Sequence, residues 1–150
     1  MEFKVKITSQ SGEEILLGDT GNDKNTIKQI NITFDTIDEN VCRKGDGSLL
    51  HLTIIGDIKY DDVEGSTTIG ELKKLFEWAK SEDSYELYRT VEIEVYINQR
   101  PLRSYKFQKM FVEDYRENFY SSSMRNTDKI SGFELRLTQM ENNFDKIESN

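Results

Sequence analysis

The sequence predicts a mainly β protein: an antiparallel barrel or tight sandwich of six to seven strands with one inserted helix. Apolar and polar residues alternate with a period of two in at least five segments, as on strands buried on one face. A single segment, at about 67–80, has the 3.6-residue period of an amphipathic helix. The strand-like segments follow one another in hairpin order, which is typical of antiparallel barrels and sandwiches.

The first four predicted strands lie at 3–8, 15–18, 26–37 and 49–58. The last two form an antiparallel pair, and Gly56 marks a bulge or bend near its end. The loop that joins this pair, residues 38–48, is longer than the roughly two to five residues that a hairpin needs. We therefore expect the loop to have a function.

The predicted helix has capping-box spacing at Thr68 and Glu71, where each side chain can bind a free amide of the first turn. Its expected apolar stripe consists of Ile69, Leu72, Leu75, Phe76 and Ala79. This stripe should pack on the sheet and leave the lysines in water.

Two strands follow the helix on either side of the turn at 98–101, and a last strand lies at 133–140. The residues expected to face inward are Val91, Ile93, Val95, Ile97, Tyr105, Phe107, Phe111, Phe133, Leu135 and Leu137. Met110 and Val112 are out of phase with Phe111, which predicts a bulge near Lys109 or burial on both faces there.

The length of 150 residues predicts one domain at 1–140, followed at 141–150 by a polar tail that is frayed or a short helix. The 28 acidic and 20 basic residues give a net charge of −8, which disfavours direct binding to nucleic acid. No segment is typical of a signal peptide or of a membrane span. We expect a soluble cytoplasmic protein, with export by a route that leaves no mark in the sequence as the alternative.

No motif indicates a catalytic centre, a cofactor or a metal site. His51 is the only histidine and Cys42 the only cysteine, and no nucleophile motif surrounds either residue. Two acidic groups could hold a hard cation, but solvated turn residues explain them as well: Asp19, Asn22 and Asp23, and Asp57, Asp61 and Asp62. We therefore predict that the protein is not an enzyme.

The segment "VEDYRENF" gathers acidic residues beside Arg116. Simple strand alternation places Glu113 and Asp114 on opposite faces, and Arg116 can neutralise its neighbours. We interpret the cluster as a salt-bridge face, solvated or between subunits, and not as a catalytic pair of carboxylates.

Taken together, six segments carry a family resemblance between about Ile30 and Gln139: "INITFDT", "LTIIGDI", "IGELKKLFEWAK", "RTVEIEVYI", "YKFQKMFVEDYRENF" and "GFELRLTQ". Their order resembles the tail-tube superfamily, which includes the tube proteins of contractile phage tails and the Hcp-type tube of type VI secretion. More narrowly, the chain is similar to tube-like proteins of prophage-type injection particles.

The resemblance implies a structural protein that forms rings, hexameric in this family, which can stack into a hollow tube. It implies contacts through strand edges and through the loop 38–48, with other copies of the chain and with other proteins of the injection particle. The subunit-contact residues expected on this basis are Val41, Arg43, Lys44 and Arg116. Outward charges such as Glu92 and Glu94 would make the lumen hydrophilic.

Two other classes of function stay open. One is a monomeric antiparallel barrel that serves as a binding or adaptor module for a small ligand or a protein partner. The other is a small hydrolase that uses Asp or Glu, which ranks last because no motif supports it.

Overall fold

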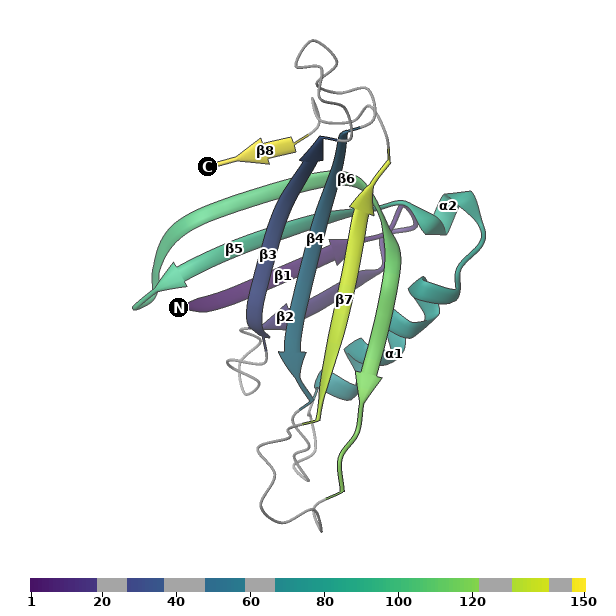
Figure 1. The fold of residues 1–150 in the computed structure, drawn as a ribbon, viewed down its shortest axis with the longest axis horizontal. Helices are drawn as coiled ribbons and strands as arrows, with labels where there is room; N and C mark the ends of the chain where they lie inside the picture. The colour runs from purple at the N-terminus through teal and green to yellow at the C-terminus, as the bar shows by residue number, and fades with distance from the viewer. Residues whose placement is uncertain (19–26, 37–47, 59–66, 122–130, 141–146) are drawn as a thin grey trace.

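The computed structural model describes residues 1–18, 27–36, 48–58, 67–121, 131–140 and 147–150, and Figure 1 shows their arrangement. The strands in this part of the chain are β1 (Glu2–Thr8), β2 (Glu14–Gly18), β3 (Ile27–Thr36), β4 (Ser48–Asp57), β5 (Arg89–Ile97), β6 (Arg100–Asn118), β7 (Gly132–Gln139) and β8 (Ile147–Ser149). The helices are α1 (Thr67–Lys80) and the short α2 (Ser84–Leu87).

The strands form one antiparallel sheet in the order β2-β1-β5-β6-β7-β4-β3, and β8 pairs with β6 beside this path. The sheet folds over on itself, so that β3, β4 and β7 cross over β1, β2 and β5 (Figure 1). Crossed layers of this kind enclose a core, as in a partly open barrel. The predicted antiparallel, mainly β fold class is confirmed, with eight strands among the described residues.

Strand β6 is 19 residues long and joins the two layers of the sheet. Residues 100–110 pair with β5, whereas residues 110–118 pair with β7. The change of partner coincides with a shift of register at Lys109, whose φ of 60° is left-handed. Because a bulge bends a strand and increases its twist, it lets one strand serve both layers. The bulge predicted near Lys109 is therefore confirmed.

The bulge at Lys109 also decides which side chains of β6 enter the core. Phe107 and Met110 are fully buried, at 1% and 0% exposure. Phe111, which was expected to face inward with Phe107, lies on the outer face and packs edge-on against Tyr88, with ring centroids 5.9 Å apart. A second bulge was expected near Gly56, and the register does shift there, in β3 between Ile27 and Gln29.

The core lies between the two layers of the sheet. Its most buried strand residues, each at most 2% exposed, are Val5, Ile7, Ile15, Leu50, Leu52, Ile54, Val91, Ile93, Phe107, Met110, Phe133, Leu135 and Leu137. These include the inward face predicted for β7, Phe133, Leu135 and Leu137. Ile97, also expected inward, is 39% exposed because it lies at the end of β5, beyond the fully buried Val91 and Ile93.

Helix α1 has the bounds that the sequence predicts, but it turns a different face to the core. Leu72, Leu75 and Trp78 are buried, and the Trp78 indole Nε1 donates a hydrogen bond to the carbonyl of Leu87 at 2.9 Å. Phe76 is 48% exposed and Ala79 is also exposed, contrary to the predicted stripe. Residues three apart share a helix face, so burying the large Trp78 rotates Phe76 outward.

Glu71, the second member of the predicted capping box, binds the neighbouring strand β2. Its Oε2 accepts a hydrogen bond from the backbone amide of Leu16 at 2.8 Å, and its Oε1 lies 3.2 Å from Lys74 Nζ. Lys74 Nζ in turn donates to the carbonyl of Glu14 at 3.2 Å. Two side chains of α1 thus bind backbone groups of β2, the terminal strand of the sheet.

The tail does not end as the frayed segment or short helix that was expected. Residues 147–149 form β8, which pairs with Tyr105, Lys106 and Phe107 of β6. Backbone hydrogen bonds between Ser104 and Asn150 extend this pairing to the last residue. Neither described helix is both long and apolar enough to cross a membrane.

Candidate assembly surfaces

Arg116 is the predicted subunit-contact residue that the structure describes. Its Nε lies 3.3 Å from Asp114 Oδ2, and the two side chains are 60% and 41% exposed. An ion pair this exposed contributes little to stability, so it leaves both charges available to a partner. The other three predicted contact residues lie outside the described residues, as does the loop 38–48 except for Ser48.

Glu113 and Asp114 both lie on the outer face of β6, and the prediction that they lie on opposite faces is wrong. The register between β6 and β7 shifts between Val112 and Asp114, which makes Glu113 the additional residue of a bulge. Glu113 Oε2 accepts a hydrogen bond from Thr138 Oγ1 at 2.7 Å and lies 3.1 Å from His51 Nδ1. We call these three residues, which come from β6, β7 and β4, the His51 cluster.

The hydroxyl of Thr138 holds the pKa of Glu113 below its ordinary value, and His51 acts in the same direction against partial desolvation. Hydrogen bonds to a carboxylate favour its charged form. The outward phase of His51 can be read from the sequence, because Leu50 and Leu52 face inward. Its meeting with Glu113 requires the strand order β6-β7-β4, which no local pattern gives.

The His51 cluster is not arranged for nucleophilic catalysis. The hydroxyl of Thr138 donates to the same carboxylate oxygen that His51 contacts, whereas a catalytic triad needs the histidine between the hydroxyl and the carboxylate. Within the described ranges, no group of three His, Cys, Asp or Glu side chains is placed to hold a metal ion. Asp57, from the acidic group that also contains Asp61 and Asp62, has its Oδ1 3.2 Å from Lys28 Nζ. Cys42 and the remaining acids of those groups lie outside the described residues.

The outer face of β1, β5 and the first part of β6 carries alternating charges. Lys4 is opposite Glu94, Lys6 is opposite Glu92, and Glu92 is also opposite Lys106. Opposite charges on neighbouring strands attract each other and keep the face hydrophilic. Glu92 and Glu94 therefore lie away from the core, as their phase in the sequence predicts.

The two ends of the sheet differ in their access to another strand. At β2, the amide of Leu16 and the carbonyl of Glu14 are bound by side chains of α1. At the other end, β3 pairs with β4 and has no second strand partner among the described residues. A strand at the end of a sheet can pair with another chain when its backbone groups are accessible. Among the described residues, side chains of α1 bind β2 at one end of the sheet, whereas β3 forms the other end.

An open groove of about 340 Å³ lies between α1 and the end of β6. We call it the α1 groove, and its lining residues are Leu72, Lys73, Phe76, Glu77, Glu117 and Phe119. Phe76 and Phe119 are large apolar side chains that are 48% and 66% exposed. Glu117 Oε1 accepts a hydrogen bond from the Tyr115 hydroxyl at 2.6 Å, which orients the carboxylate. Burial is the main cause that raises the pKa of that hydroxyl, and the bonded Glu117 raises it further.

No protein-family model and no curated protein matches the chain. Solved structures match it over nearly its whole length at low sequence identity. An Hcp protein is 9% identical, with a TM-score of 0.62, and the match covers 100% of this chain and 98% of that one. For Hcp1 from E. coli EAEC 042 the identity is 8%, the TM-score 0.58, and the coverage 100% and 98%.

The sheath/tube terminator of the extracellular contractile injection system PVC, in its extended state, is 13% identical with a TM-score of 0.52. That match covers 99% of this chain and 92% of the terminator. At these identities the likeness concerns the fold alone, and the order of elements agrees with the resemblance found in the sequence. The chain therefore has the fold of the tail-tube superfamily.

Proposed function

We propose that the chain is a structural, non-catalytic subunit that forms rings in a contractile injection particle. In this proposal the rings then stack into a tube. The observation that carries the proposal is the match of the whole chain to nearly the whole of an Hcp protein and of a tube terminator. Release from the cell as part of such a particle follows from this role.

The surfaces of the molecule support assembly without a ligand. The largest fully buried side chains, Trp78, Phe107 and Phe133, lie in the core, where a ligand-binding barrel would need an apolar cavity. Outside the core, β3 offers a strand edge, and the alternating charges around Glu92 and Glu94 offer a face suited to a hydrophilic lumen. These features favour the ring over the monomeric binding module.

The contacts between rings are assigned to the loop 38–48. In our proposal Arg43 and Lys44 give this loop a basic tip, Val41 supplies its large aliphatic side chain, and the acidic face of the next ring receives it. Arg116, on the outer face of β6, is assigned to a contact between subunits. Such contacts should form faster at low salt and weaken at high salt, because mobile ions screen exposed charges.

Light scattering after size-exclusion chromatography, together with electron microscopy of the same fractions, tests the proposal. We expect the parent to form rings whose stacking increases with concentration and decreases with salt. Replacing residues 38–48 by Asn-Gly should give folded monomers or isolated rings that no longer stack. A parent that stays monomeric at every concentration would overturn the proposal that the chain forms rings. A shortened chain that stacks as well as the parent, at low and high salt, would remove the loop from the contact.

A further inference from the structure

The hairpin of β5 and β6 carries a second exposed apolar surface, on the side of the molecule away from the α1 groove. Its exposed apolar residues are Met1 (75%), Ile97 (39%) and Leu102 (50%). Met1 belongs to this surface because β1 continues the pairing in which Glu2 lies opposite Tyr96. Arg100 and Arg103 are exposed beside these residues. We call the five residues the hairpin patch.

The hairpin patch projects from the barrel on a stiff turn. Asn98 and Gln99 alone connect β5 to β6, with φ values of 49° and 65°. Two successive left-handed residues are typical of the type I′ turn, whose twist matches that of the flanking strands. The hairpin thus presents its end as a preformed surface, which would lose little conformational freedom on binding.

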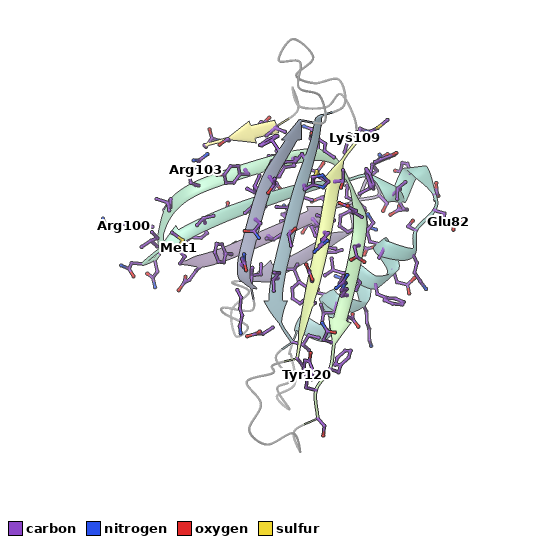
Figure 2. All side chains as sticks on the ribbon, in the orientation of Figure 1. Met1, Glu82, Arg100, Arg103, Lys109 and Tyr120 are labelled. Carbon is purple, nitrogen blue, oxygen red and sulfur yellow. The ribbon has the colours of Figure 1, made fainter. Side chains whose placement is uncertain are left out.

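The hairpin patch and the α1 groove lie on opposite sides of the molecule. Figure 1 shows the β5–β6 turn at the left, and α1 with the end of β6 at the right. Figure 2 places Arg100 and Met1 together at the left and Glu82, which follows α1, at the far right. One surface lies at the end of a hairpin and is apolar and basic, and the other is an apolar groove. The groove bears two carboxylates, of Glu77 and Glu117, and one ammonium group, of Lys73.

We propose that the hairpin patch of one copy of this chain docks in the α1 groove of the next copy. Leu102 and Ile97 would cover Phe76 and Phe119, and Arg100 would face the carboxylates at the rim. Arg103 has a local role as well, since its guanidinium donates to Ser149 Oγ at 2.8 Å and lies over the Tyr105 ring. Arg100 is therefore assigned the contact across the interface.

A contact between two different surfaces of one chain is head-to-tail, and it produces a ring when the rotation between neighbours closes. The proposal rests on the ring-forming function above and names the residues of its lateral contact. It differs from the contact of the loop 38–48, which joins one ring to the next.

Two double variants test the two surfaces of the contact one at a time. Leu102→Asp combined with Ile97→Asp disables the hairpin patch and leaves the groove, whereas Phe119→Asp combined with Phe76→Asp disables the groove and leaves the hairpin patch. Each variant alone should lose lateral association by about 30-fold or more in Kd, the size of effect expected for the loss of an apolar anchor. Mixed at equal concentration, the two variants should form a 1:1 complex of twice the 17.5 kDa chain mass and nothing larger.

The complementation follows from the head-to-tail geometry, because the mixture has one intact hairpin patch and one intact groove per pair. A light-scattering mass of two chains in the mixture, with monomers in each separate sample, is the expected result. Met140→Asp is the matched control, since Met140 is 44% exposed and belongs to neither surface. Circular dichroism of each variant checks that the fold is retained.

Arg100→Glu provides a milder test that leaves the apolar contact in place. We expect it to weaken lateral association by about tenfold and to reduce the salt dependence of that association. Rings that form equally well from the parent and from both double variants would overturn this contact and leave the proposed function standing. A parent that forms no ring would overturn both proposals. A mixture that stays monomeric while the parent forms rings would also overturn the head-to-tail contact.

Discussion

Gly18, at the end of β2, holds a backbone conformation that a side chain would disturb. Its φ is +98°, and a Cβ atom added there would lie 2.0 Å from the carbonyl oxygen of Phe3. We expect Gly18→Ala to cost at least about 3 kcal/mol in free energy of unfolding, since backbone strain and overpacking add together. Urea denaturation followed by circular dichroism measures this difference.

Two other glycines are controls for Gly18, because nothing lies within 4 Å of a Cβ atom added to either. Gly12→Ala meets backbone strain alone, at a φ of +95°, and should cost about 1–2 kcal/mol. Gly70→Ala, in the first turns of α1, should stabilise by about 0.5–1 kcal/mol. Equal effects at Gly12 and Gly18 would contradict the role assigned to the carbonyl of Phe3.

Glu113 makes the stability sensitive to acid. The pKa of Glu113 is lower in the folded protein than its ordinary value. The charged carboxylate therefore stabilises the fold above the ordinary pKa, and this stabilisation is lost as the pH falls through the lowered pKa of the folded protein. Thr138→Val removes the hydroxyl that contributes most and keeps the side-chain shape. We expect this variant to be less stable than the parent by at most about 1 kcal/mol at neutral pH, because the carboxylate is half exposed.

The difference between the parent and Thr138→Val should shrink as the pH falls below the ordinary pKa of a glutamate and through the lowered pKa of Glu113 in the parent, because the carboxylate then becomes protonated in both proteins. Free energies of unfolding measured in urea at a series of pH values provide the check. A difference that stays constant with pH would mean that Thr138 acts through packing and not through Glu113.

At the scale of elements, α1 protects the edge of β2 through Glu71 and Lys74. Glu71→Ala leaves the amide of Leu16 without the carboxylate, and a lost hydrogen bond to a charged group costs about 1.5–3 kcal/mol. Glu77→Ala is the control two turns along the helix, where the ion pair with Lys80 is exposed and should contribute less than about 1 kcal/mol. Chemical denaturation compares the two variants, and an equal loss in both would contradict the role of Glu71 at the edge.

The elements most fully predicted from the sequence are those that depend on local pattern. The inward face of β7 follows from alternation, and the bounds of α1 follow from its period. The face of α1 could not be predicted, because Phe76 and Trp78 compete for burial and the buried Trp78 is held by the carbonyl of Leu87, which lies beyond the helix. Strand β8 could not be predicted either. It has only three residues within a polar segment, and they form a strand because they pair with β6.

The same limit applies to the candidate surfaces. Arg116 and its ion-pair partner are neighbours along one strand, so their contact can be expected from spacing. The His51 cluster and the α1 groove join residues that are distant in the chain, and their formation depends on strand order and on the bulges of β6. Sequence patterns identify such residues as exposed but do not show which of them meet.

At the scale of the whole molecule, we expect a single cooperative unfolding transition. β6 pairs with strands of both layers, so neither layer can open without breaking contacts with the other. Fluorescence of Trp78, the only tryptophan, reports on α1, whereas far-ultraviolet circular dichroism reports on the sheet. The two transitions in urea should coincide. Separate midpoints would show that α1 detaches before the sheet unfolds.

The continuity of β6 has a mechanical consequence for the ring proposed above. The strand begins at Arg100, in the hairpin patch, and ends at Asn118, beside Phe119 of the α1 groove. Tension around the ring would therefore travel through each subunit along one covalent backbone. Its hydrogen bonds to β5 and β7 would be loaded in shear, many at once, instead of being peeled apart singly. The bulges at Lys109 and Glu113 are points at which this backbone could lengthen before the pairing yields.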